Sequence, residues 1–159
     1  MKVQHISISD LKGGASRAAY RLHSALKATG VESKMTVLYK ESADATVEGL
    51  NPLPLSTRFK RMYHRQKMDM KMLRWSTNNP VLHSFGLVDL GLVDMLNNSD
   101  ADIIHLHWVC NMLSVEAIGA INKPIVWTLH DMWPFCGTEH YVNDSAIARF
   151  RLGYHNENR

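Results

Sequence analysis

Hydrophobic and polar positions in the first 40 residues follow two different periods. An apolar run at residues 3–8 has the length of a buried strand and precedes the turn Gly13-Gly14. From residue 15 to 29 the apolar positions recur with a spacing near 3.6, which predicts a helix that ends at Gly30. A second apolar run, at residues 33–39, predicts another strand. Strand, glycine turn, helix and strand in this order predict a βαβ unit on a parallel sheet.

The alternation of strand and helix patterns returns after residue 88. Short helices are predicted at residues 88–97 and 114–121, and strands at residues 102–108 and 124–129. Proline and asparagine interrupt the pattern at residues 51–54 and 77–80. We therefore predict the α/β class, with a doubly wound, mainly parallel sheet of about four strands and helices on both faces. We expect one domain over residues 1–145 and a polar C-terminal tail over residues 146–159.

Length and composition narrow the class of protein. The chain has 159 residues, of which 45% are hydrophobic and 21% charged, as in one soluble globular domain. No apolar run is long enough to span a bilayer, and the first residues lack the apolar core of a signal peptide. Cys110 and Cys136 are too few to build a disulfide scaffold. We expect a cytoplasmic protein whose thiols are reduced.

Positive charge is concentrated in residues 58–74, where apolar residues at helical spacing predict a basic amphipathic helix. Such a helix can lie on an anionic membrane surface, and it can equally pack its apolar stripe on the sheet. We favour the membrane interpretation, in which the protein is cytoplasmic and binds peripherally to the inner membrane. No motif for DNA or RNA occurs, so we expect no nucleic-acid partner. The residues expected at the membrane surface are Arg58, Lys60, Arg61, Arg65 and Lys67.

Polar and aromatic residues follow the two later strands where each strand ends. His105, His107 and Trp108 close the first of these strands. The second, expected to be buried, ends on His130-Asp131 and breaks into an aromatic loop at residues 132–135. The carboxyl ends of parallel strands meet at one edge of the sheet, where open α/β sheets bind ligands. Aromatic rings beside a polar pair suit a carbohydrate, so we predict a saccharide site.

Several of the candidate residues also have a structural interpretation. The Gly13-Gly14 turn can bring backbone N–H groups to a phosphate or a sugar, with Arg17 adding a charge, or it can be a plain tight turn. It does not match G-x-G-x-x-G, so no dinucleotide is predicted. Trp108 and Trp133 are either platforms for a sugar ring or core residues. His130 can also be a structural histidine that caps the strand end, and Arg17 can be an ordinary surface residue.

The histidines also allow a metal centre, which makes a metallohydrolase the alternative enzyme. His105 and His107 are two residues apart on a strand and so face the same side of the sheet. The spacings H-x-H-x-D-H and H-E-x-x-H are absent, so we expect no metal and expect His105 to be satisfied within the sheet. The candidate metal ligands are His105, His107, His130, Asp131, Cys136 and His140.

Four segments together resemble a known family. They read M-K-V-Q-H-I-S-I-S-D at 1–10, G-G-A-S-R-A-A-Y-R-L-H at 13–23, A-D-I-I-H-L-H-W-V at 101–109 and K-P-I-V-W-T-L-H-D-M-W-P-F-C-G at 123–137. This set is similar to the N-terminal, acceptor-side domain of bacterial family 4 glycosyltransferases of the exopolysaccharide, colanic acid and O-antigen type. The resemblance covers nearly the whole chain, is most specific in the last segment and is loosest over residues 40–100.

The resemblance implies a Rossmann-like domain that forms one half of a GT-B architecture. It implies retaining transfer of a sugar from a nucleotide-sugar to a lipid-linked or polysaccharide acceptor, with no metal or other cofactor. In this comparison His130 is the catalytic residue near the transferred sugar, and Gly13-Gly14 lie near the donor phosphates and the acceptor.

The same resemblance leaves the donor side unaccounted for. The family's donor domain, with its E-x-x-x-x-x-x-x-E motif, is absent from these residues, so we expect a truncated chain that is inactive alone. Nucleotide-sugar binding would then need a donor domain. A stand-alone carbohydrate- or partner-binding module is the alternative outside the enzymes.

Overall fold

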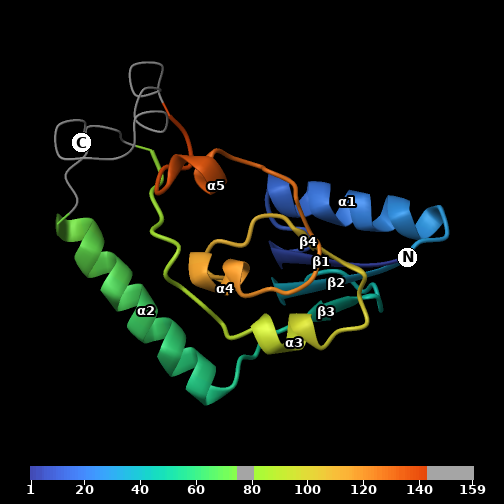
Figure 1. Cartoon of the computed structure of the whole chain (residues 1–159), viewed down its shortest axis with the longest axis horizontal. Helices are drawn as coiled ribbons and strands as arrows, with labels where there is room; N and C mark the ends of the chain where they lie inside the picture. The colour runs from blue at the N-terminus through green and yellow to red at the C-terminus, as the bar shows by residue number, and fades with distance from the viewer. Residues whose placement is uncertain (75–80, 143–159) are drawn as a thin grey trace.

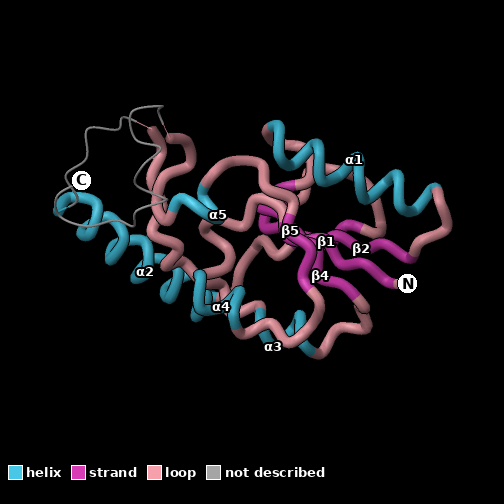
Figure 2. The backbone as a smooth tube through the Cα atoms, turned by 45° about the horizontal axis from the view of Figure 1, so that its top comes forward, coloured by secondary structure: helices cyan, strands magenta, loops and turns pink. Residues whose placement is uncertain are grey.

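Five parallel strands form a single sheet in the part of the chain that the structure describes. A computed structural model gives the positions of residues 1–74 and 81–142. The strands are β1 (Lys2–Ser9), β2 (Glu32–Tyr39), β3 (Val47–Gly49), β4 (Ile103–Leu106) and β5 (Ile125–Trp127). Figure 1 labels the first four, and Figure 2 labels β5. The helices are α1 (Gly14–Ala28), α2 (Leu55–Arg74), α3 (Val93–Asn97), α4 (Val115–Gly119) and α5 (Trp133–Cys136).

The strand order is β3-β2-β1-β4-β5, which confirms the predicted α/β class with a doubly wound parallel sheet. The chain builds outward from β1 to β2 and β3, and then returns to β4 on the other side of β1. This reversal between β1 and β4 is the topological switch point, where α/β sheets place their ligands. Gly30 adopts a φ of +82° after α1, as expected for the predicted helix stop.

The two faces of the sheet differ in polarity. Figure 2 shows α1 on one face and α3 and α4 on the other. The α3 and α4 face holds the main hydrophobic core, in which Ile6, Ile104 and Leu106 pack with residues of both helices. The α1 face has only a small apolar cluster, under the helix. Much of its remaining buried surface is polar: Ser7, His5, His105 and His107.

The strand over residues 124–129 differs from its prediction. The expectation of a buried strand is wrong, because β5 is the edge of the sheet and its Ile125 and Val126 side chains are 37% and 46% exposed. The aromatic loop expected after it contains the helical turn α5. Pro134 lies in the first turn of α5, where its missing N–H costs no hydrogen bond. The short strand β3 was not predicted.

The predicted basic helix is confirmed as α2, which begins at Leu55 and lies at the lower left in Figure 1. Its less exposed positions, which mark the side turned to the rest of the chain, are Thr57, Arg61, His64, Met68 and Met72. No helix within residues 1–74 and 81–142 is long and apolar enough to cross a bilayer. The predicted break at residues 77–80 and the predicted tail at residues 146–159 lie outside the described residues.

Candidate functional site

A cavity of about 540 Å³ lies at the carboxyl edge of the sheet, near the switch point between β1 and β4. It brings together two sequence-predicted glycines from the start of α1 with three sequence-predicted residues that follow β4 and β5. These five residues are Gly13, Gly14, Trp108, His130 and Asp131. The lining is completed by Ile8, Lys12, Ala15, Ser16 and Tyr141.

The N-terminus of α1 opens into this cavity. Gly13 has a φ of +90°, a conformation that favours glycine, whereas Gly14 has no such requirement. Among residues 1–74 and 81–142, no side chain caps the helix. Since the first N–H groups of a helix have no partner within it, those of Gly14, Ala15 and Ser16 are available to oxygen atoms in the cavity. The helix dipole favours negatively charged oxygens at this position.

Two of the predicted binding residues do not line the cavity. Arg17 is exposed on α1, and its backbone N–H donates to the Gly13 carbonyl at 3.2 Å. Trp133 is only 4% exposed, and its indole N–H donates to the Ser84 carbonyl at 2.8 Å. The Trp133 ring also lies against Gly86, where a Cβ atom would come within 2.9 Å of it. Trp133 is therefore a core residue in this structure.

Asp131 organises the wall of the cavity that follows β5. Its Oδ2 atom accepts hydrogen bonds from Trp108 Nε1 at 2.8 Å and from His140 Nδ1 at 2.6 Å. Its Oδ1 atom accepts from the backbone N–H of Trp133 at 3.0 Å. One carboxylate thus fixes the Trp108 indole beside the cavity and ties it to α5.

Sequence reasoning missed Ser84, which extends this network. Ser84 Oγ lies 3.0 Å from Nε2 of His140, so Asp131, His140 and Ser84 have the order of a serine-hydrolase triad. Ser84 and His140 are 7% and 1% exposed, however, and a nucleophile has to be reached by its substrate. The backbone N–H of Ser84 also donates to the Thr138 carbonyl. We therefore assign this network a structural role: it holds together the segments around residues 84, 131 and 140.

A row of histidines leads from the α1 face of the sheet to the cavity. His5 Nδ1 lies 3.0 Å from His107 Nε2, and His107 Nδ1 lies 3.1 Å from His130 Nε2. His105 stacks on His107, with ring centroids 4.3 Å apart. His105 Nε2 lies 2.7 Å from the Thr128 hydroxyl, so His105 is satisfied within the sheet as expected.

Burial keeps these histidines neutral. Loss of solvation, followed by the effect of the neighbouring imidazoles, lowers the pKa of His5 to about 3 and that of His107 to about 2. Burial also lowers the pKa of His105 and, against the opposing charge of Asp131, that of His130. Each neutral ring therefore has one N–H donor and one acceptor nitrogen.

Three of the buried histidines also have the geometry of a metal-binding group. His5, His105 and His107 each bring one ring nitrogen within 4.8 Å of the others. This group is not the predicted one, because it includes His5 and lacks His130, Asp131, Cys136 and His140. His140 is instead hydrogen-bonded to Asp131 and Ser84. Since β1 and β4 are far apart in the chain, their pairing was not readable from the sequence. Neutral imidazoles are ligands for zinc, so a metal centre, and with it a metallohydrolase, stays the alternative prediction.

Comparison of the chain with protein-family models, with curated proteins and with solved structures finds no match in any of the three. The assignment of a function therefore depends on the geometry of the site together with the sequence motifs.

Proposed function

We propose that the cavity at the switch point binds a saccharide and that the chain is the acceptor-side domain of a retaining glycosyltransferase. The observation that supports this most directly is the convergence of the Trp108 indole, the His130 imidazole and the open N-terminus of α1 on one cavity of about 540 Å³. A volume of this size suits a small-molecule ligand. The sequence resemblance supplies the reaction class, namely transfer from a nucleotide-sugar to a lipid-linked or polysaccharide acceptor.

Each wall of the cavity suits a different part of a sugar. The Trp108 ring, held by Asp131, offers an apolar surface to the C–H groups of a pyranose. The N–H groups at the start of α1 can donate to hydroxyl or phosphate oxygens. His130 offers a ring nitrogen to a hydroxyl group near the reacting carbon. Charge developing on a leaving diphosphate needs stabilisation from a donor-binding domain, so we expect no turnover by this chain alone.

Saccharide binding to the 159-residue chain tests the proposal. Two-dimensional NMR titrations with a panel of mono- and disaccharides should perturb signals around Trp108 and His130. Trp108→Ala should weaken binding by about tenfold, the loss expected for a buried aromatic contact of about 1.4 kcal/mol. Trp108→Phe should retain part of the affinity because it keeps a ring. His130→Gln should also weaken binding, because it removes an imidazole that lines the cavity. His64→Gln, in the half-buried stripe of α2, is its matched control and should bind like the wild type.

Two results would contradict this assignment. If no NMR signal is perturbed at millimolar saccharide, the cavity does not bind a saccharide. If Trp108→Ala binds as tightly as the wild type, the saccharide binds elsewhere. Turnover of UDP- or GDP-sugars by the isolated chain at ordinary enzymatic rates would overturn the expected inactivity.

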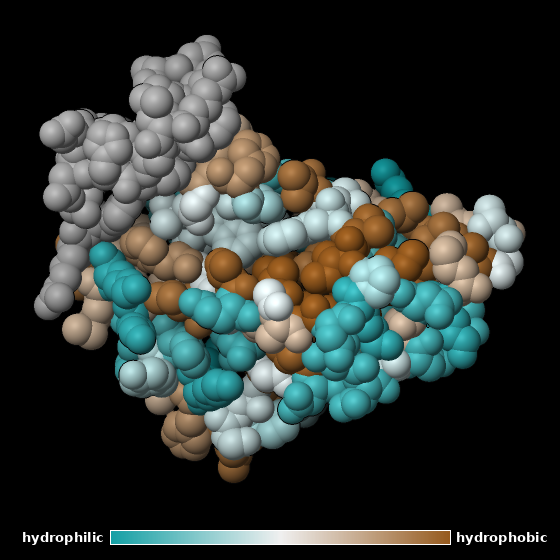
Figure 3. Space-filling view, viewed as in Figure 1, coloured by the Kyte–Doolittle hydropathy of each residue, from teal (hydrophilic) through white to brown (hydrophobic). Residues whose placement is uncertain are grey.

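We also propose that α2 docks on an anionic membrane surface. Its large apolar side chains face away from the half-buried stripe at residues 57–72, with exposures between 51% and 88%. These side chains are Leu55, Phe59, Met62, Tyr63, Met70 and Leu73. At about 100° per residue, Arg58 and Arg65 lie on one side of these exposed apolar side chains, and Lys67 lies on the other. Figure 3 shows hydrophilic and hydrophobic side chains next to each other over α2.

Two of the five predicted membrane residues have contacts with the rest of the chain. Arg61 is half-buried, and its Nη1 donates to the Tyr39 hydroxyl at 3.3 Å. Lys60 Nζ lies 3.6 Å from the Asp89 carboxylate, although its side chain is half exposed. Arg58, Arg65 and Lys67 are the exposed cations of the predicted set that have no such contact among the described residues.

Liposome co-sedimentation tests the docking of α2. Binding should require anionic lipid and should fall as salt is added, because exposed charges are screened. The double variant Arg65→Gln/Lys67→Gln should bind about 30-fold more weakly, at about 1 kcal/mol for each basic residue. Lys34→Gln, at an exposed position of β2 outside α2, is the control and should bind like the wild type. Equal binding to neutral vesicles, or by the double variant, would contradict the proposal.

A further inference from the structure

Three histidines form a continuous hydrogen-bonded chain that ends at the cavity. His5 and His107 are buried, and His130 is half-buried and lines the cavity. His107 uses both ring nitrogens, one toward Nδ1 of His5 and one toward Nε2 of His130. Because His107 occupies Nε2 of His130, Nδ1 is the ring nitrogen of His130 that is left for a ligand.

The buried end of the chain determines its direction. Since each neutral ring has one N–H, the N–H groups point either from His5 toward His130 or from His130 toward His5. Nε2 of His5 is buried and has no hydrogen-bond partner among the described residues. If the N–H groups pointed inward, this atom would be an unsatisfied buried donor, which is rare in proteins. If they point outward, it carries only a lone pair.

We propose that His5 and His107 are positioning residues that hold His130 in the tautomer with its proton on Nδ1. The cavity then receives a hydrogen-bond donor from His130, aimed at a sugar or phosphate oxygen, and His130 does not act as a base toward the acceptor. The role toward a sugar rests on the proposed function, whereas the tautomer itself depends only on the three hydrogen-bonded rings.

The surroundings of the chain are consistent with fixed, neutral rings. His105 stacks on His107 and is itself held by the Thr128 hydroxyl. His23 approaches His5 edge-on, with ring centroids 5.7 Å apart, and uses its own nitrogens on Ser33 and Thr46. The lowered pKa values of His5 and His107 mean that neither ring takes a second proton near neutral pH. Asp131 is the acid next in sequence to His130.

Nitrogen NMR of the ring-labelled chain tests the tautomer directly, without any sugar. Protonated and unprotonated ring nitrogens resonate in separate regions of a long-range proton–nitrogen correlation spectrum. At pH 7.5 the wild-type chain should show Nδ1 of His130 protonated, with roughly tenfold excess over the other tautomer, as expected for one buried hydrogen bond. A wild-type spectrum in which Nε2 of His130 carries the proton would overturn the proposal.

Two substitutions at the buried end separate positioning from a structural role. His5→Leu removes the donor to His107, so the tautomer excess at His130 should fall several-fold. His5→Asn places an amide N–H near the position of Nδ1 and should restore the excess. His64→Gln on α2 is the control and should leave His130 unchanged. An unchanged His130 in a folded His5→Leu chain would overturn the proposal. If His5→Leu does not fold, the wild-type and His5→Asn spectra decide it.

The same spectra test the metal alternative. One equivalent of zinc chloride should leave the ring signals of His5 and His107 as they are in the presence of a chelator. Zinc that shifts both rings and displaces the proton they share would overturn the proposal. Because no saccharide is present, failure of saccharide binding would not change these spectra, and the effect of Trp108→Ala on saccharide binding is measured separately from the tautomer of His130.

Discussion

At the scale of single residues, the best-connected group at the cavity is a carboxylate. Asp131 accepts hydrogen bonds from the Trp108 indole, from His140 and from the backbone of Trp133, and its side chain is 8% exposed. His140 passes the connection on to the Ser84 hydroxyl. A residue expected from the sequence to touch a sugar therefore also holds the cavity wall in place, and its substitution should affect stability first.

We predict that Asp131→Asn lowers the free energy of unfolding by about 2–3 kcal/mol, because it weakens charge-assisted hydrogen bonds to buried donors. Ser84→Ala should cost only about 1 kcal/mol and should leave saccharide binding intact. Urea denaturation followed by circular dichroism measures both. Asp69→Asn, exposed on α2, is the matched control and should stay within about 0.5 kcal/mol of the wild type. Covalent labelling of Ser84 by a fluorophosphonate would contradict its structural assignment.

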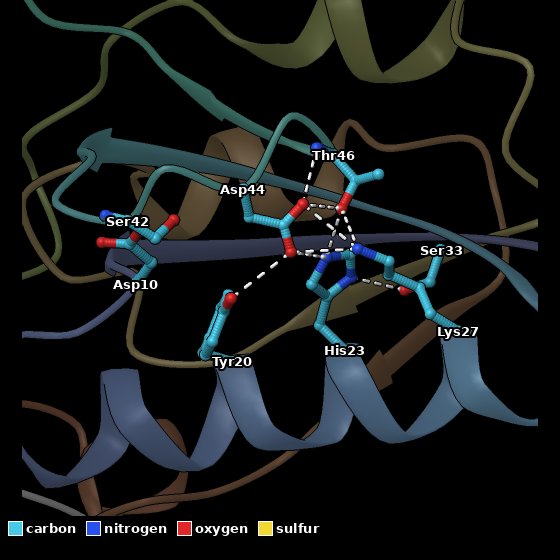
Figure 4. Close-up of polar contacts among 8 residues, drawn as sticks. All are labelled: Asp10, Tyr20, His23, Lys27, Ser33, Ser42, Asp44 and Thr46. Atoms are coloured by element: carbon cyan, nitrogen blue, oxygen red, sulfur yellow. Dashed lines mark hydrogen bonds and ion pairs between the residues drawn. The ribbon is translucent and has the colours of Figure 1, made fainter.

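At the scale of elements, a polar network fixes α1 against the connection between β2 and β3. Figure 4 shows Tyr20, His23 and Lys27 extending from α1 toward Asp44 and Thr46. Lys27 Nζ contacts both oxygens of Asp44, at 3.0 and 3.1 Å, and His23 Nε2 lies 2.9 Å from the Thr46 hydroxyl. Because α1 begins at the cavity, this network also sets where its free N–H groups lie.

We predict that Asp44→Ala destabilises the chain by about 2 kcal/mol, since it removes the partner of Lys27 and the acceptor of the Thr46 N–H. The hydrogen bonds from Thr46, followed by the contact with Lys27, lower the pKa of Asp44. The contribution of Asp44 to the free energy of unfolding should thus be present above the ordinary carboxyl pKa of 3.8 and lost as the pH falls below it. Urea denaturation of wild type and variant at pH 7 and pH 3 should show the difference shrink. A constant difference would contradict this origin.

Local patterns identified the elements well, and non-local contacts account for what they missed. The 3.6-residue spacing predicted α1 and α2, and the rule for strand ends brought Trp108, His130 and Asp131 to one cavity. His5 could not be connected to this site, because its position depends on the register of β1 against β4, where it faces His105. The burial of Trp133 likewise depends on Ser84 and Gly86, about 50 residues earlier in the chain.

At the scale of the whole molecule, the polar α1 face makes stability depend on pH. Histidine has a pKa of 6.5 in the unfolded chain, whereas burial lowers it to about 3 for His5 and about 2 for His107. As the pH falls below 6.5, the unfolded chain takes up protons that these two residues of the folded chain do not. The free energy of unfolding is therefore highest above this pH and decreases below it. Carboxylates with a lowered pKa, such as Asp44, contribute to acid sensitivity only below about pH 4.

We predict that the free energy of unfolding decreases by at least about 2 kcal/mol between pH 6.5 and pH 5.5. His5 and His107 contribute about 1 kcal/mol each, and the other histidines whose pKa burial lowers, His23, His105 and His130, add to this. Urea denaturation at pH 7.5, 6.5 and 5.5 measures this slope. His5→Leu should make the decrease smaller by about 1 kcal/mol, because one buried histidine is removed, and His64→Gln on α2 is the matched control. A free energy of unfolding that stays constant over this range would mean that the folded chain binds as many protons as the unfolded one. His5 and His107 would then be charged in the folded chain, and the direction proposed for their N–H groups, which requires neutral rings, would be wrong.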